Sequence, residues 1–102
     1  MLIIINMNIK DTQRISKISK EVLVKHNKTH LDCRDKGIIK EIYQKTGWKD
    51  KQTDYVIVYS VLNALTKESK REDAMFTMSW VNLPGITRLT RRFTLKCKPS
   101  MI

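Results

Sequence analysis

Two histidines and a cysteine lie close enough along the chain to suggest metal chemistry. His26 and His30 have the i,i+4 spacing that places two ligands on one face of a helix, and Cys33 follows them closely. The intervening Asn27-Lys28-Thr29 is polar and typical of a loop, and nothing nearby completes a zinc ligand set. The second cysteine, Cys97, lies far away and belongs to no Cys-x-x-Cys pair. We therefore expect neither a metal site nor a disulfide framework.

Patterns that support catalysis are absent from the sequence. It contains no glycine-rich phosphate loop, no Gly-x-Ser-x-Gly elbow and no His-Glu-x-x-His motif. The acids are scattered singly or stand together in Glu72-Asp73, where solvation explains them. A nucleophilic Cys97 would need a base, and both histidines are distant in sequence. We expect no enzymatic activity, no catalytic residue and no cofactor.

The charge of the chain indicates a phosphate-bearing partner. Its 102 residues include 20 Lys+Arg against 10 Asp+Glu, a formal net charge of +10. Each cation that neutralises a phosphate releases a condensed counterion, which favours binding without any reading of base sequence. Such a charge also serves solubility alone. An excess of this size nevertheless favours nucleic acid, without distinguishing DNA from RNA.

The apolar residues 2–5 do not indicate a membrane protein. They are too few to span a bilayer, and they lack the charged start and cleavage site of a signal peptide. No stretch combines a strong apolar face with a basic face and aromatic anchors. We expect no membrane partner and a cytoplasmic, nucleoid-associated location.

Hydrophobic periodicity predicts three helices. The first runs from Asn8 to about His26 as a basic amphipathic helix, and residues 27–34 are expected to connect it to the next. The second runs from about Asp35 to Thr46, and Gly47 ends it. We divide the chain into an N-terminal extension, residues 1–34, and a helix-helix-hairpin domain, residues 35–102.

The third helix starts near residues 49–52, with Asp50 or Thr53 as possible cap, and runs to about Lys67. Its apolar side chains cover too wide a face for a helix resting on one neighbour. We therefore expect a homodimer in which a second copy encloses Val58, Leu62 and Leu65.

The last part of the chain predicts a β-hairpin with one basic face. Residues 75–83 and 86–98 favour strands and flank the turn signal Pro84-Gly85. Alternation in the last strand places Leu89, Phe93 and Leu95 on a core face that Arg91 interrupts. The opposite face carries basic and hydroxyl side chains, and no acid occurs after Asp73. The candidate nucleic-acid contacts are Arg88, Arg91, Arg92, Lys96 and Lys98 on this strand, with Arg14, Lys17 and Lys20 of the first helix as a second set.

Short motifs in the second half of the chain resemble the HU/IHF family of bacterial architectural DNA-binding proteins. Gly37-Ile-Ile-Lys-Glu-Ile-Tyr-Gln-Lys-Thr-Gly-Trp-Lys-Asp-Lys-Gln52 and the apolar helix after it are similar to the family's opening helices. Val81-Asn-Leu-Pro-Gly-Ile86 resembles its Val-x-Leu-x-Gly-Phe turn, and Lys96-Cys-Lys-Pro-Ser100 its Phe-Lys-Pro-Gly/Ser segment. The DNA-wrapping arm and the C-terminal helix of the family are missing. The resemblance implies an intertwined dimer whose β-saddle faces DNA, without the proline wedge.

The expected fold is therefore α+β, with three helices followed by a β-hairpin or small antiparallel sheet in an HU-like β-saddle. A winged helix is the alternative, with the third helix as recognition helix and the hairpin as wing. That helix carries no basic residue between Tyr55 and Leu65, which favours the saddle.

The expected function is non-catalytic, largely sequence-tolerant DNA binding through the basic strand face, in an architectural or regulatory role. One alternative is a small basic RNA-binding subunit of a ribonucleoprotein. Another is a small viral or plasmid factor that inhibits a host protein through an exposed apolar patch, for which Trp48, Met78 and Trp80 are candidates.

Overall fold

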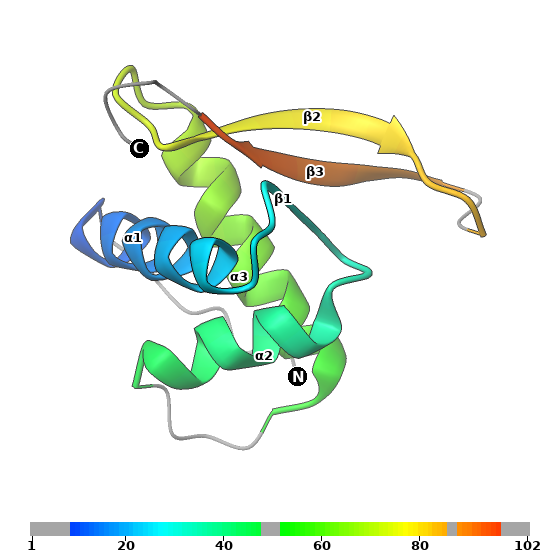
Figure 1. The fold of residues 1–102 in the computed structure, drawn as a ribbon, viewed down its shortest axis with the longest axis horizontal. Helices are drawn as coiled ribbons and strands as arrows, with labels where there is room; N and C mark the ends of the chain where they lie inside the picture. Colours follow the sequence, from blue (N-terminus) through cyan, green and yellow to red (C-terminus); the bar gives the residue numbers. More distant parts are fainter. Residues whose placement is uncertain (1–8, 48–51, 86–87, 97–102) are drawn as a thin grey trace.

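Three helices support a small antiparallel sheet in the computed structural model, which describes residues 9–47, 52–85 and 88–96 (Figure 1). The elements follow the order α1 (Ile9–Lys25), β1 (His30–Asp32), α2 (Lys36–Lys45), α3 (Asp54–Ser69), β2 (Phe76–Asn82) and β3 (Leu89–Leu95). The strands lie in the order β1-β3-β2. The expected α+β class, the three helices and the hairpin are confirmed. Residues 2–5 and Trp48, which the sequence singled out, lie outside the described residues.

The strand β1 corrects the expectation that residues 27–34 form only a connection. Asn27 adopts a positive φ of 56°, and Lys28 N donates to Leu23 O at 2.8 Å, which turns the chain out of α1. The next residues pair antiparallel with β3, with Leu31 opposite Phe93. Three residues are too few to show the alternation of apolar and polar side chains that predicts a strand. The segment is a strand because it pairs with β3, and the sequence alone does not indicate it.

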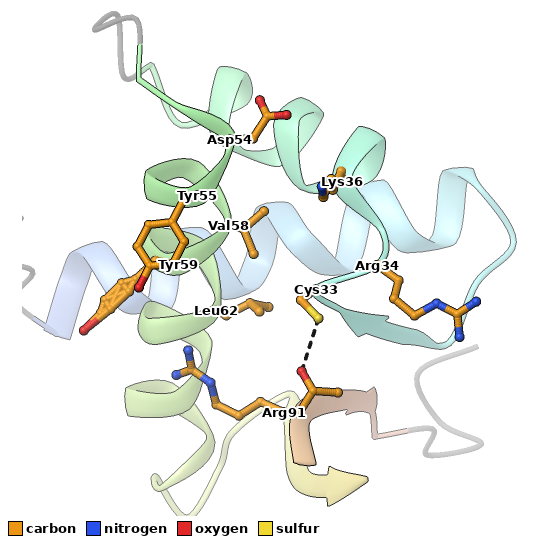
Figure 2. Close-up of a pocket in the computed structure, with 10 residues that line it drawn as sticks. Cys33, Arg34, Lys36, Asp54, Tyr55, Val58, Tyr59, Leu62 and Arg91 are labelled. Carbon is orange, nitrogen blue, oxygen red and sulfur yellow. Dashed lines mark hydrogen bonds between the residues drawn. The ribbon is translucent and has the colours of Figure 1, made fainter. Parts of the chain in front are cut away.

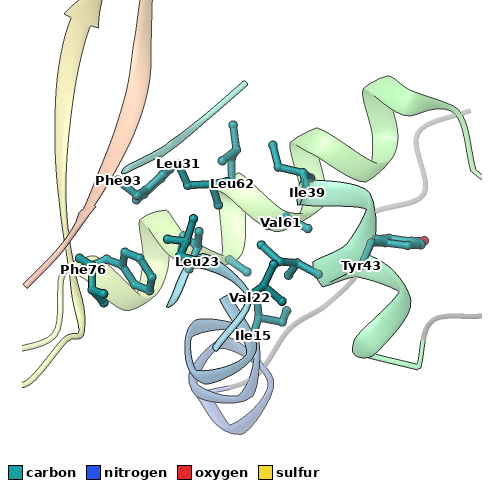
Figure 3. Packing of buried hydrophobic residues seen from close by; sticks show 14 residues of the cluster. Ile15, Val22, Leu23, Leu31, Ile39, Tyr43, Val61, Leu62, Phe76 and Phe93 are labelled. Carbon is teal, nitrogen blue, oxygen red and sulfur yellow. The ribbon is translucent and has the colours of Figure 1, made fainter. Parts of the chain in front are cut away.

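One hydrophobic core joins all three helices to the sheet. Figure 3 shows Phe76 and Phe93 of the sheet beside Leu23 of α1 and Leu62 of α3. Ile15 and Val22 of α1 belong to the same buried cluster, so the helix of the expected N-terminal extension shares the core of the rest.

The width of the apolar face on α3 has an explanation within a single chain. Leu62 is 3% exposed and Leu65 is fully buried, because α1, α2 and β2 all pack against this helix. Val58, Leu62 and Leu65 were expected to be enclosed by a second copy. The chain's own elements cover Leu62 and Leu65, whereas Val58 is half-buried. Dimerisation stays a prediction, but the burial of α3 no longer requires it.

The helix α3 begins slightly later than residues 49–52, and of the two expected caps Thr53 is confirmed. Thr53 is its N-cap, and the Thr53 hydroxyl accepts from Val56 N at 3.3 Å. Asp54 places a negative charge in the first turn, where the helix dipole favours it. The start of α3 is therefore fixed by the sequence around it.

The hairpin β2–β3 reaches past the helices at its turn (Figure 1). Near the helices its inner face is buried, as at Phe76 and Phe93. Farther along, Trp80 and Leu89 are 58% and 63% exposed. In the sequence Trp80 alternates with Phe76 and Met78, which is more simply explained by a core face than by the exposed patch for which Trp80 is also a candidate. The core interpretation is wrong for Trp80, because the hairpin is longer than the helical layer beneath it.

Candidate functional site

The outer face of β3 carries fewer available cations than the sequence pattern indicates. Within the strand its outward residues are hydroxylic except for Arg92, and Ser79 lies opposite Arg92 on β2. Arg88 is exposed just before the strand, and Lys96 is half-buried just after it. Lys98 lies outside the described residues.

Arg92 has an acidic neighbour that the sequence analysis did not assign to it. Arg92 Nε lies 3.7 Å from Asp32 Oδ2, and Asp32 is 6% exposed. The second carboxylate oxygen, Oδ1, accepts from Arg34 N at 2.9 Å. The final strand was expected to lack a compensating acid, and β1 supplies one. Part of the charge of Arg92 is therefore used within the fold.

Arg91 points to the opposite face, as its position in the alternation predicts. Its Nη1 donates to Thr66 Oγ1 of α3 at 2.8 Å. This hydrogen bond spans from the sheet to the helix and fixes the guanidinium beneath the hairpin. Since arginine has five N–H donors, most of them remain for a ligand.

The candidate residues of α1 form a separate set. Arg14 and Lys17 are exposed and Lys20 is half-buried. None of them lines the groove described below. Of the predicted contacts within the described part of the chain, Arg91 alone lines this groove.

A groove of about 580 Å³ lies between α3, the turn from β1 to α2, and the start of β3 (Figure 2). Val58 and Leu62 of α3 give it apolar walls, and Arg91 closes it at the sheet. Cys33 and Thr90 lie across one side, with Cys33 Sγ 3.2 Å from Thr90 Oγ1. Three segments distant in sequence therefore meet around one hollow.

The charges around this groove are mainly positive. Among the described residues that line it, Arg34, Lys36 and Arg91 are cations and Asp54 is an acid. Lys40 Nζ lies 2.9 Å from Asp54 Oδ1, and this hydrogen bond lowers the pKa of the Asp54 carboxyl. No ion pair joins the three cations to an acid within the described part of the chain. The groove is therefore suited to an anion.

Two tyrosines form an aromatic rim on α3. Tyr55 and Tyr59 are 70% and 37% exposed and both line the groove. Their rings are stacked, with centroids 6.2 Å apart and planes at 4°. In the sequence both belong to the wide apolar face of the third helix. Their i,i+4 spacing and their hydroxyls among aliphatic neighbours were the signal that could have distinguished them.

Side chains that could hold a metal do not converge. Among residues 9–47, 52–85 and 88–96, no three histidine, cysteine, aspartate or glutamate side chains form a ligand group. His26 Nε2 lies 2.8 Å from Glu41 Oε1, whereas His30 Nδ1 lies 3.1 Å from Thr94 Oγ1. The two histidines thus have different neighbours. No helix in these ranges is long and apolar enough to cross a membrane.

No family model, curated protein or solved structure matches this chain. The resemblance to the HU and IHF proteins therefore remains a prediction from short motifs. The groove and its cations are the observations from which a function can be argued.

Proposed function

We propose that the chain is a winged-helix domain that binds DNA without catalysis and with little sequence preference. The element order, helix-strand-helix-helix-strand-strand, and the strand order β1-β3-β2 are those of a winged helix. In this arrangement α2 and α3 form the helix-turn-helix and β2–β3 forms the wing. The order supports this alternative over the HU-like saddle, whose outer strand face would here offer an arginine already beside Asp32.

The observation that supports the proposal is that Arg34, Lys36 and Arg91 all line one groove, with the Arg34 guanidinium directed outward at its edge (Figure 2). They come from the turn before α2, the first residue of α2, and the wing. A phosphate backbone that passes between a recognition helix and a wing follows this path. Contacts to phosphate supply affinity and position the protein, and they carry no base information.

The composition of α3 supports tolerance of sequence. Bases are read mainly by bidentate side chains, arginine or lysine for guanine and asparagine or glutamine for adenine. The exposed side chains in the first half of α3 are Asp54, Tyr55 and Tyr59, and its asparagine, Asn63, is half-buried. None of the three exposed residues belongs to those base-reading types.

The test is fluorescence anisotropy of a labelled duplex at two salt concentrations, with the triple variant Arg34→Gln, Lys36→Gln, Arg91→Gln. A matched control neutralises three other lysines together, Lys10, Lys67 and Lys70, which are exposed and do not line the groove. We expect the wild-type affinity to fall steeply with salt. The triple variant should bind weakly, with the log–log salt slope smaller by about 2–3.

Two results would contradict the proposal. One is an absence of duplex binding by the wild type at low salt. The other is an equal loss of duplex affinity in the triple variant and in the matched lysine control, because net charge alone would then explain the affinity.

A further inference from the structure

We infer that the groove between α3 and the wing binds unpaired bases, so that the preferred ligand is a single-stranded segment of DNA. The inference rests on the proposed function and narrows it to a substrate class. Duplex binding at the phosphates and stacking in the groove are separable in experiment.

The stacked tyrosines are a preformed platform for a base. Tyr55 has a largely free ring at 70% exposure, and Tyr59 supports it in parallel at 4°. Thr53 caps the first turn of α3, and the ion pair between Asp54 and Lys40 ties that turn to α2. The rings therefore sit on a fixed part of the helix. A base that stacks on them loses little additional freedom of the protein.

An unpaired base fits this platform better than a duplex does. In a duplex the base faces are covered by their neighbours, and a helix in the groove meets only base edges. A tyrosine ring offers its face, which any unstacked base can use. The groove of about 580 Å³ is of the size that holds small organic ligands, and Val58 and Leu62 give it apolar walls.

The cations determine which kind of partner enters. Arg34 and Lys36 stand on one side and Arg91 on the other, while the acid Asp54 is engaged by Lys40 (Figure 2). A second copy of this chain carries a net charge of +10 and would be repelled at such a site. A strand that combines aromatic bases with a phosphate on each nucleotide matches both the rings and the charges.

The wing extends the aromatic surface. Trp80 is the cross-strand partner of Arg91 and is 58% exposed on the same face of the hairpin. A strand leaving the groove along the wing would therefore meet a further ring. Alternating cations and rings of this kind are typical of surfaces that bind single strands.

The test measures the affinity for a labelled oligo(dT) and for a hairpin duplex of equal charge. Both probes are titrated with the wild type and with Tyr55→Ala, Tyr55→Phe and Val24→Ala. Val24 is a matched control, since it is 61% exposed on α1 and does not line the groove. Tyr55→Ala should weaken oligo(dT) binding by about 5- to 100-fold and change duplex binding by less than about 2-fold. Tyr55→Phe and Val24→Ala should resemble the wild type.

A second measurement locates the contact directly. Oligonucleotides that carry 5-iodouracil should photocrosslink to the peptide containing Tyr55, as identified by mass spectrometry. Thermal unfolding by circular dichroism should show that Tyr55→Ala remains folded, since the side chain is mostly exposed.

Each other outcome overturns the inference in a distinguishable way. If Tyr55→Ala lowered the affinity for oligo(dT) and for the duplex equally, Tyr55 would contact both kinds of DNA and would not be a platform for unpaired bases. If Tyr55→Ala left the binding of both oligo(dT) and the duplex unchanged, the groove would not be a site for unpaired bases, and the proposed function would stand. A wild-type dimer that Tyr55→Ala dissociates would make a second copy the occupant. Binding of neither probe would overturn the proposed function as well.

Discussion

Arg92 Nε on β3 lies 3.7 Å from Asp32 Oδ2 on β1, and the carboxylate is nearly buried at 6% exposure. Asp32 lies opposite Arg92 in the register of the two strands. This pair joins the edge strand to the centre of the sheet. It also makes Arg92 a structural residue in addition to a candidate DNA contact.

We expect Arg92→Gln to destabilise the fold by about 1–2 kcal/mol, because it removes the cation beside the buried Asp32 carboxylate. The loss is no larger, since Arg92 itself is partly exposed and its Nε makes no hydrogen bond in the described part of the chain. The matched change Arg88→Gln should cost less than about 0.5 kcal/mol, since Arg88 is exposed before the strand. Urea denaturation of both variants measures the difference in unfolding free energy. Equal stabilities would show that the ion pair contributes nothing to the fold.

The sequence predicted those parts of the fold that leave a local pattern. The helices α1, α2 and α3 have apolar periodicity, and the hairpin has a turn signal at Pro84-Gly85. The strand β1 has no such pattern, because its three residues become a strand only through pairing with β3. The acid at Asp32 was therefore invisible as a partner of Arg92.

A substitution at Leu31 measures how much the short strand β1 contributes to the free energy of unfolding. It is fully buried at the centre of β1 and lies opposite Phe93, also fully buried. Leu31→Ala should lower the unfolding free energy by about 2–5 kcal/mol, since it leaves a cavity in the core. His30→Ala, at an exposed neighbouring position, should change it little. A loss below about 1 kcal/mol for Leu31→Ala would mean that β1 is not part of the cooperative core.

Two buried serines on α1 should be dispensable. The hydroxyls of Ser16 and Ser19 are buried and have no hydrogen-bond partner in the described part of the chain. Since an unsatisfied buried hydroxyl costs free energy, Ser16→Ala and Ser19→Ala should each leave stability unchanged or raise it by up to about 1 kcal/mol.

The contrasting variant is Thr12→Val on the same helix. Its single hydroxyl proton is shared between two acceptors, Ile9 O at 2.9 Å and Glu68 Oε2 at 3.2 Å. Thr12→Val should therefore destabilise the protein. Thermal unfolding of the three variants measures whether the two serine hydroxyls and the Thr12 hydroxyl differ in their effect on stability. Melting temperatures that fall for Ser16→Ala and Ser19→Ala as for Thr12→Val would contradict it.

A pH-dependent contact joins α1 to α2 at Glu41. The hydrogen bond from Lys25 Nζ, followed by that with His26, lowers the pKa of the Glu41 carboxyl from 4.5 to about 2. Because the pKa is lower in the folded state, the stabilisation is complete above about pH 4.5 and is lost as the pH falls towards 2.

Glu41→Gln should therefore lower the melting temperature at neutral pH, and its difference from the wild type should vanish towards pH 2. The measurement is thermal unfolding across this range. Glu21→Gln, which removes an exposed carboxylate of α1, is the control. A difference between Glu41→Gln and wild type that stays constant with pH would exclude the linkage.

The groove could be predicted from sequence only in part. The basic residues of the last strand were recognised, including the opposite orientation of Arg91. Arg34 and Lys36 were overlooked, because they belonged to a segment assigned as a connection and to a helix start. Their meeting with Tyr55 depends on how α2, α3 and β3 pack, which short-range patterns do not encode.

Cys33 provides a probe of whether DNA occupies this groove. It lines the groove and is half-buried, with Sγ 3.2 Å from Thr90 Oγ1. Saturating oligo(dT) should slow alkylation of Cys33 by a small maleimide several-fold, because a ligand in the groove covers the thiol. Peptide mass spectrometry separates Cys33 from Cys97, and the free amino acid cysteine in the same tube controls for the reagent. With Tyr55→Ala and the same oligonucleotide concentration, the protection of Cys33 should be lost in proportion to the lost affinity. Equal alkylation rates of Cys33 with and without saturating oligonucleotide would place the nucleic acid elsewhere, with the basic face of α1 as the next surface to test.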